Sequence, residues 1–223
     1  MANELDGWIR NEIAPTLRDH GFRGGPRRFR RRSSGFVAGI QFQSSSGNVF
    51  GTWRFTINFG VQHERLAKME GSERPDGWHV ARRVSGKRGA DVWWDVGVGN
   101  DPVIVAGQVR DTLRRDVLPF LDLASTPEGF RSCVAALPKP WGDELLRQVD
   151  VTEAYDPTTD ARSPAERRLE LMTTDPRTQE LFAQHPELGG FLEAAALGPE
   201  DAMRWAKANP EAVKALACPP REP

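Results

Sequence analysis

Two runs of alternating side chains, Phe36–Gln43 and Thr52–Gly60, constrain the fold of this chain more than any other feature. Successive side chains of a β-strand point to opposite faces of a sheet, so each run has an apolar face and a polar face. In the second run the apolar side chains are Trp53, Phe55, Ile57 and Phe59, and the polar ones are Thr52, Arg54, Thr56 and Asn58. We expect the two runs to pair as antiparallel neighbours, with the apolar face covered by other parts of the chain.

Three further segments have the pattern of strands. One lies around Phe29, one covers His79–Val84, and one covers Asp91–Val98. Together with the first two runs, they predict an antiparallel sheet of about five strands.

Two long helices are predicted to cover the apolar face. Within residues 3–20, an apolar residue recurs every four positions, and Pro15 predicts a kink or an early end. The second helix is expected to begin at Asn100 or Asp101, because a polar cap followed by Pro102 is typical of a helix start, and to run to about Leu121. The side chains expected to face the sheet are Leu5, Ile9, Ile13 and Leu17 in the first helix and Val103, Ala106, Val109, Leu113, Val117 and Leu121 in the second. Residues 1–124 are therefore predicted to form an α+β domain.

The remainder of the chain has the pattern of short helices. We expect residues 125–154 to be a helical extension of the first domain, with Ser125 and Glu128 as a capping box. Residues 155–223 are expected to be an all-α tail of short helices, entered through a linker at 155–163. Helix starts are predicted at Ser163, Asp175, His185 and Asn209.

Charge is divided unevenly along the chain, although the net charge is only −1. Residues 1–124 have 19 basic and 14 acidic side chains, or +5, and residues 125–223 have 11 and 17, or −6. The two parts therefore differ in surface charge, and the acidic tail is one candidate cover for the basic part.

Several classes of protein are disfavoured by the sequence. Cys133 and Cys218 are too few for a disulfide scaffold or a metal cluster, and we expect neither a metal nor a cofactor. The opening residues, MANELDGWIRNEIAP, have acids among the apolar side chains and predict neither a signal peptide nor a membrane span. We therefore expect a cytoplasmic protein without a membrane partner.

The polar face of the sheet is the leading candidate for a binding surface. In the segment Asp91–Val98, Trp94 is on the side of Val92 and Val96 and is expected in the core, so Trp93 points to the polar face. An aromatic side chain among amides suits a contact with a protein. The candidate binding residues are Gln41, Gln43, Arg54, Asn58 and Trp93.

A basic run gives an alternative, because arginines beside aromatic rings can bind phosphates and stack on bases. The candidate patch for nucleic acid consists of Arg27, Arg28, Arg30, Arg31, Arg32, Arg83, Lys87 and Arg88. The same run also fits a solvated edge strand, whose like charges discourage aggregation.

A third hypothesis is an enzyme with a dispersed site. No local motif supports it, since the chain lacks a Gly-x-Ser-x-Gly elbow, an HxxxH pair and a phosphate-binding loop before a helix.

The chain contains an ordered set of short segments: IAPTLRDHGF at Ile13–Phe22, Phe29, Phe42–Ser44, FTINFGV at Phe55–Val61, Arg83 with Val84, and Trp93 with Trp94. In order and spacing, this set resembles a bacterial family known as Domain of Unknown Function 4304. The segments span residues 5–124, and the chain departs from the family where Ser85 precedes Gly86. The resemblance implies this fold and a bacterial protein, and it implies no activity.

We therefore expect a non-catalytic cytoplasmic module that binds a protein partner. An immunity or defence role is expected only by analogy with other small single-domain proteins. A nucleic-acid-binding module is the alternative.

Overall fold

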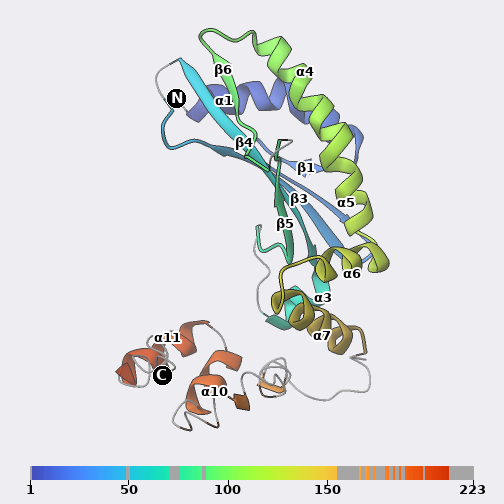
Figure 1. Ribbon diagram of the computed structural model, residues 1–223. Coiled ribbons are helices and arrows are strands. Elements are labelled where there is room, and N and C mark those ends of the chain that lie inside the picture. The colour runs from blue at the N-terminus through green and yellow to red at the C-terminus, as the bar shows by residue number, and fades with distance from the viewer. Residues whose placement is uncertain are drawn as a thin grey trace. The chain divides into compact units, whose positions relative to one another are not determined.

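The computed structural model describes two compact units (Figure 1). The first is Met1–Ala67 with Glu73–Arg147, and the second is Lys68–Ser72 with Gln148–Pro223. The described residues are 2–48, 51–70, 76–86 and 89–154, and then 166, 169–170, 173, 179–180, 183, 186, 189–197 and 199–210. The first unit holds the sheet and the surfaces discussed below.

The sheet is antiparallel throughout, which confirms the predicted α+β class. Its strands are β1 (Arg23–Gly24), β2 (Arg28–Ser33), β3 (Phe36–Ser44), β4 (Thr52–His63), β5 (Val80–Arg83) and β6 (Trp94–Gly97). Strands β1 to β5 are neighbours in sequence order, and β6 also pairs with β4. Strand β4 is long enough for two partners, with β5 beside residues 58–61 and β6 beside residues 52–55.

The two alternating runs form the centre of the sheet as β3 and β4. Phe42 lies opposite Ile57, and Ile40 lies opposite Phe59. All four of these side chains are buried, because the pairing register puts both apolar sets on the same face. The predicted antiparallel pairing is therefore confirmed.

Two helical rods cover that face, and each contains a π-helical segment just before a proline. The first consists of α1 (Ala2–Trp8), η1 (Ile9–Ile13) and α2 (Ala14–Asp19). The second consists of α4 (Pro102–Thr112), η2 (Leu113–Val117) and α5 (Leu118–Ala124). In both rods the proline, Pro15 or Pro119, is the second residue after the π segment. A proline removes one backbone donor and crowds the preceding turn, and a locally wider turn relieves both problems.

Aromatic contacts join the rods to the sheet. The rings of Trp8 and Phe55 are 5.7 Å apart between centroids, and those of Phe59 and Phe120 are 5.4 Å apart. Figure 1 shows α4 and α5 along one side of the sheet. The residues expected to face the sheet are buried, except Val103, which is 66% exposed. Val103 lies in the first turn of α4, and Val105 is the first buried apolar residue of that helix.

The helix starts follow local capping chemistry. Asp101 caps α4 by accepting a hydrogen bond from the backbone N–H of Val103, with Pro102 at the first helical position, as predicted. The predicted capping box at Ser125 was wrong by one residue. Helix α6 (Pro127–Ala135) is capped by Thr126, whose hydroxyl accepts from the backbone N–H of Gly129. Two other helices, α3 (Glu64–Glu70) and α7 (Trp141–Ala154), follow β4 and α6 along the chain.

The second unit contains the described helices α10 (Gly189–Leu197) and α11 (Pro199–Ala208). Phe191 and Trp205 join them, with ring centroids 5.4 Å apart. The helical C-terminal region is thus confirmed. The helix starts predicted at Ser163, Asp175 and His185, and the linker at 155–163, lie outside the described residues. None of the described helices has the length and apolar character needed to cross a membrane.

Candidate functional site: the polar face of the sheet

The pairing register places polar side chains in rows across the face opposite the rods. One row runs over four strands, from Arg28 through Gln41 and Asn58 to Arg83. The next row holds Gln43 and Thr56, which are opposite each other. Beyond it, Arg54 of β4 is opposite Asp95 of β6. Four of the five residues predicted to bind a partner therefore lie near one another on one face of the sheet.

Arg83 connects these rows into a hydrogen-bonded network. Its Nε donates to the Asn58 Oδ1 at 2.7 Å, one Nη donates to the Gln43 Oε1 at 3.0 Å, and the other donates to the Asp91 Oδ2 at 2.7 Å. Asn58 in turn donates to Gln43 at 2.7 Å and to Gln41 at 3.4 Å. Each group therefore limits the rotamers of its neighbours, so the surface is ordered before any ligand arrives.

A second ion pair borders the network. The Nε and one Nη of Arg54 donate to the two carboxylate oxygens of Asp95, at 2.9 and 3.0 Å. The hydrogen bonds and the charge of Asp95 raise the pKa of Arg54 above its ordinary value. Arg54 is thus a permanent cation held in one orientation by a bidentate contact.

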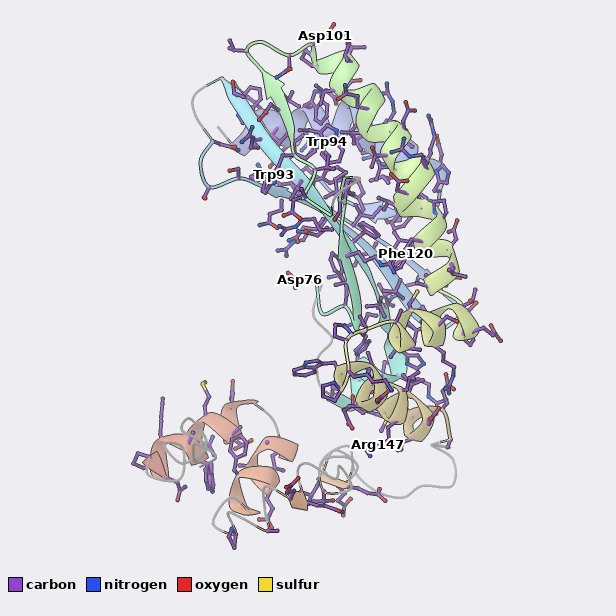
Figure 2. All side chains as sticks on the ribbon, viewed as in Figure 1. Asp76, Trp93, Trp94, Asp101, Phe120 and Arg147 are labelled. Carbon is purple, nitrogen blue, oxygen red and sulfur yellow. The ribbon has the colours of Figure 1, made fainter. Side chains whose placement is uncertain are left out.

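The two adjacent tryptophans separate to opposite faces, as predicted. Trp94 is 6% exposed and stacks on Phe55, with ring centroids 5.7 Å apart, whereas Trp93 is 36% exposed. Figure 2 shows Trp94 on the side of the sheet that faces α4 and α5, and Trp93 on the other side. Continuing the β4–β6 register by one residue sets Trp93 level with Thr56. We call the exposed surface made by Gln41, Gln43, Arg54, Asn58, Arg83 and Trp93 the platform.

Next to the platform, this face is covered at Gly39 and Gly60 by a segment that the sequence did not predict. Gly39 and Gly60 lie opposite each other in β3 and β4, and the indole of Trp78 lies over both. A Cβ placed on Gly39 would collide with the indole nitrogen, and one placed on Gly60 would lie 2.8 Å from the Trp78 Cβ. A glycine inside a strand often marks a site where another part of the chain approaches the backbone closely. Gly39 and Gly60 were therefore the feature of the sequence that could have predicted a covering segment.

Residues Asp76–His79, which we call the strap, hold Trp78 in that position. The side-chain amide of Gln62 donates to the backbone carbonyl of Gly77 at 2.8 Å. At the other end of the strap, an oxygen of Asp76 is 3.5 Å from a guanidinium nitrogen of Arg28 in β2. The strap therefore crosses from β4 toward β2 and ends beside the platform.

The basic run divides between the two faces, because its residues alternate along β2. Arg27 bonds Asp6 and Ser44, and Arg31 bonds Asp122 at 2.5 Å and lies over the ring of Phe22, so both turn toward the rods. Arg28, Arg30 and Arg32 belong to the face that carries the platform. The predicted patch is therefore not one continuous surface. Lys87 and Arg88 lie outside the described residues.

Most of the charge on the platform face is neutralised by ion pairs. Arg32 is 3.1 Å from Glu64, and Arg28, Arg54 and Arg83 are paired with Asp76, Asp95 and Asp91. Arg30 has no hydrogen-bond or ion-pair partner for its side chain among the described residues. These five arginines and four carboxylates leave a net charge of +1.

A cavity of about 810 Å³ lies on the other side of the sheet's edge, between the β5–β6 connection and the second rod. Val84, Val92 and Trp94 give it an apolar floor, and Asp111, Arg115 and Asp116 lie at its polar rim. Arg115 donates to both oxygens of Asp116, which raises the pKa of Arg115. Neither histidine nor cysteine is among the described residues that line this cavity.

Among the described residues, the cysteine and the metal-ligating side-chain types do not form a second site. Burial raises the pKa of the Cys133 thiol, the opposite of an activated nucleophile, with Arg82 opposing the shift. Within the described part of the chain, no three His, Cys, Asp or Glu side chains gather in a way that could hold a metal ion.

Comparison with known proteins gives one match. Residues 13–123 match the family model described as Domain of unknown function (DUF4304), which confirms the resemblance drawn from the short segments. The match contains the whole sheet and the second helical rod almost to its end. Neither a curated protein nor a solved structure matches the chain.

Proposed function

We propose that this protein, whose residues 13–123 belong to the DUF4304 family, is a non-catalytic module that holds a protein partner on the platform. The proposal keeps the expected bacterial cytoplasm as its setting, with an immunity or defence role as the analogy suggests. The observation that carries it is the ordered network around Arg83, which joins three strands beside a partly exposed tryptophan.

The composition of the platform favours a protein partner. Tryptophan and arginine are the side chains enriched among residues that contribute most to protein–protein affinity. Because Arg83 and Arg54 are already fixed by hydrogen bonds, a partner orders few side chains when it binds, and the entropic cost of association is small. Asp91 and Asp95, 40% and 31% exposed as side chains, keep acceptor capacity at the rim.

The neutralised charge weighs against a polyanion as the principal partner. Affinity for nucleic acid comes mainly from basic side chains that replace counterions on phosphates. Four of the five arginines on this face already have carboxylate partners, and Arg27 and Arg31 turn to the opposite face.

The experiment is affinity capture with four matched forms of the full chain: wild type, Trp93→Ala, Trp141→Ala and Arg83→Lys. Trp141 is 75% exposed and lies outside the platform, so its substitution controls for general loss of a surface tryptophan. We expect a defined protein to be retained by wild type and Trp141→Ala and lost from Trp93→Ala. Arg83→Lys, which keeps the charge and loses the guanidinium fork, is expected to weaken retention about tenfold.

Circular dichroism and the unfolding midpoint of each variant show whether the fold is intact. Retention of the same proteins by all four forms would overturn the proposal. Equal loss from Trp93→Ala and Trp141→Ala would overturn it too, because the contact would then not depend on the platform.

A nucleic-acid-binding module remains the second candidate, favoured by Arg30. Its unpaired side chain lies between Arg28 and Arg32 on the same face of β2. Phosphate binding there predicts affinity for a short DNA duplex that falls steeply from 50 to 200 mM salt, and that is lost in Arg28→Glu/Arg30→Glu. A fluorescence anisotropy titration that finds binding independent of salt, or none, removes this candidate.

A further inference from the structure

A second concave surface lies away from the platform, between the N-terminal rod and the β1–β2 turn. It encloses a cavity of about 240 Å³. The lining residues are Arg10, Ala14 and Arg18 from the rod, and Gly24, Gly25, Pro26 and Phe29 from the turn and β2. All of them belong to the first unit.

The two arginines of this cavity differ from the other arginines around the rods. Arg27, Arg31 and Arg110 are within 4 Å of the carboxylates of Asp6, Asp122 and Glu12. Neither Arg10 nor Arg18 has a hydrogen-bond or ion-pair partner for its side chain among the described residues. Two uncompensated positive charges therefore line one small cavity.

Arg10 and Arg18 reach the same cavity because of their spacing on the rod. They are eight residues apart with Ala14 midway, so all three lie along one stripe of the helix. The small side chain of Ala14 leaves room between the two long ones. Arg10, Ala14 and Arg18 therefore line the cavity together from one side of the rod.

The opposite wall is mainly backbone. Gly24 and Gly25 have φ angles of +112° and +128°, which residues other than glycine rarely adopt. A Cβ on Gly24 would also lie 2.5 Å from the carbonyl oxygen of Arg28. The buried ring of Phe29 closes one side of the cavity. No side chain is available from the turn to neutralise the arginines.

Size and charge together define the ligand. Pockets for drug-sized ligands begin at about 300 Å³, so this one suits a single compact group. Two guanidinium groups match a dianion, and a phosphate monoester has a charge of about −1.5 to −2 at pH 7, whereas a carboxylate has only one.

We propose that this cavity binds a phosphate group, as inorganic phosphate or as a small phosphate monoester, between Arg10 and Arg18. The site is independent of the platform, and it goes beyond the proposed protein-binding function.

Isothermal titration of the full chain tests the site with inorganic phosphate, with O-phosphoserine and with acetate at constant ionic strength. Saturable one-to-one binding of at least one phosphate ligand is expected, with acetate at least tenfold weaker. Tighter binding of inorganic phosphate would identify the free ion as the ligand, and tighter binding of O-phosphoserine would identify a monoester.

The variants are Arg10→Gln, Arg18→Gln, the double variant, and Arg114→Gln as the matched control. Arg114 is an exposed arginine of the second rod that does not line the cavity. Each single variant is expected to bind at least tenfold more weakly, the double variant not measurably, and Arg114→Gln within twofold of wild type. Both target side chains are exposed, and unfolding midpoints confirm that the variants fold.

Three results would overturn the assignment. Wild type could bind neither phosphate ligand, the double variant could bind as tightly as wild type, or Arg114→Gln could lose as much affinity as the cavity variants. The last result would mean that diffuse surface charge, rather than the cavity, attracts the anion.

Discussion

One face of the sheet has two regions, of which one is covered by an aromatic ring and the other carries partly exposed polar side chains. Gly39 and Gly60 contribute no side chains to this face, and the indole of Trp78 lies over their backbone. One row further along the strands, Gln41 and Asn58 project from the same face and remain partly exposed.

The difference shows how a two-layer domain leaves part of a sheet available for binding. In the strapped region, the partly buried ring of Trp78 replaces water over the two buried glycines. In the platform, the polar groups satisfy one another laterally and need no cover. We infer that the strapped region contributes stability and that the platform contributes recognition, and the predictions below test that division.

The largest effect is expected for Gly60→Val. The new side chain would collide with the Trp78 indole and with the carbonyl oxygen of Val80, so the strap or β5 must move. We expect a loss of about 3 kcal/mol in the free energy of unfolding, measured by urea denaturation. Gly107→Ala is the control, since a Cβ there has open space, and it should stabilise α4 by about 0.5 to 1 kcal/mol. A loss below about 1 kcal/mol for Gly60→Val would show that the strap yields easily.

The second prediction concerns Trp78→Ala, which removes the ring from the strapped region. Complete loss of a buried tryptophan costs about 3 to 5 kcal/mol, and Trp78 is only partly buried, so we expect about 2 kcal/mol by thermal and urea unfolding. Binding at the platform should be kept in the folded variant. Loss of partner binding without loss of stability would reverse the roles that we assign to the two regions.

The third prediction concerns Thr56, which lies in the platform row of Gln43 and Trp93. Its side chain is fully buried, and its hydroxyl has no hydrogen-bond partner among the described residues. Thr56→Val keeps the shape and removes the unsatisfied group, so the free energy of unfolding should rise by about 1 kcal/mol. A drop of similar size would mean that the hydroxyl has a bonding role, and Thr56→Ser distinguishes that role from packing.

The smallest effect is expected for Arg28→Ala. Its contact with Asp76 is 3.5 Å long and both side chains are about half exposed, so the pair should contribute less than about 0.5 kcal/mol. The midpoint of urea unfolding for this variant should match that of wild type. A cost above about 1 kcal/mol would show that the ion pair, rather than the indole, holds the strap.

Alternation along the strands was enough to predict most of this face. It put Gln41, Gln43, Arg54 and Asn58 together and separated Trp93 from Trp94. The same rule applied to residues 27–32 would also have divided the basic run between two faces, since Phe29 had already fixed the apolar side of that strand.

The remaining features depend on contacts between distant segments. Arg83 joins the platform only because β5 pairs with β4 in one register, and two adjacent arginines give no periodicity from which to choose. Trp78 belongs to a loop, and its place on Gly39 and Gly60 follows from the path of the chain in space. The cavity at Arg10 and Arg18 depends likewise on the turn that faces the rod.

The two π segments have a consequence for how helical patterns are read. A step of four residues turns an ordinary α-helix by about 400°, so a stripe with that spacing rotates away by about 40° at each step. Leu5, Ile9, Ile13 and Leu17 are nevertheless all fully buried, as are Val109, Leu113, Val117 and Leu121. In the wider π turns each residue rotates the helix by a smaller angle, which compensates for this 40° drift. The apolar side chains of both rods therefore continue to face the sheet. A strict four-residue period that ends near a proline is therefore a readable sign of a π turn.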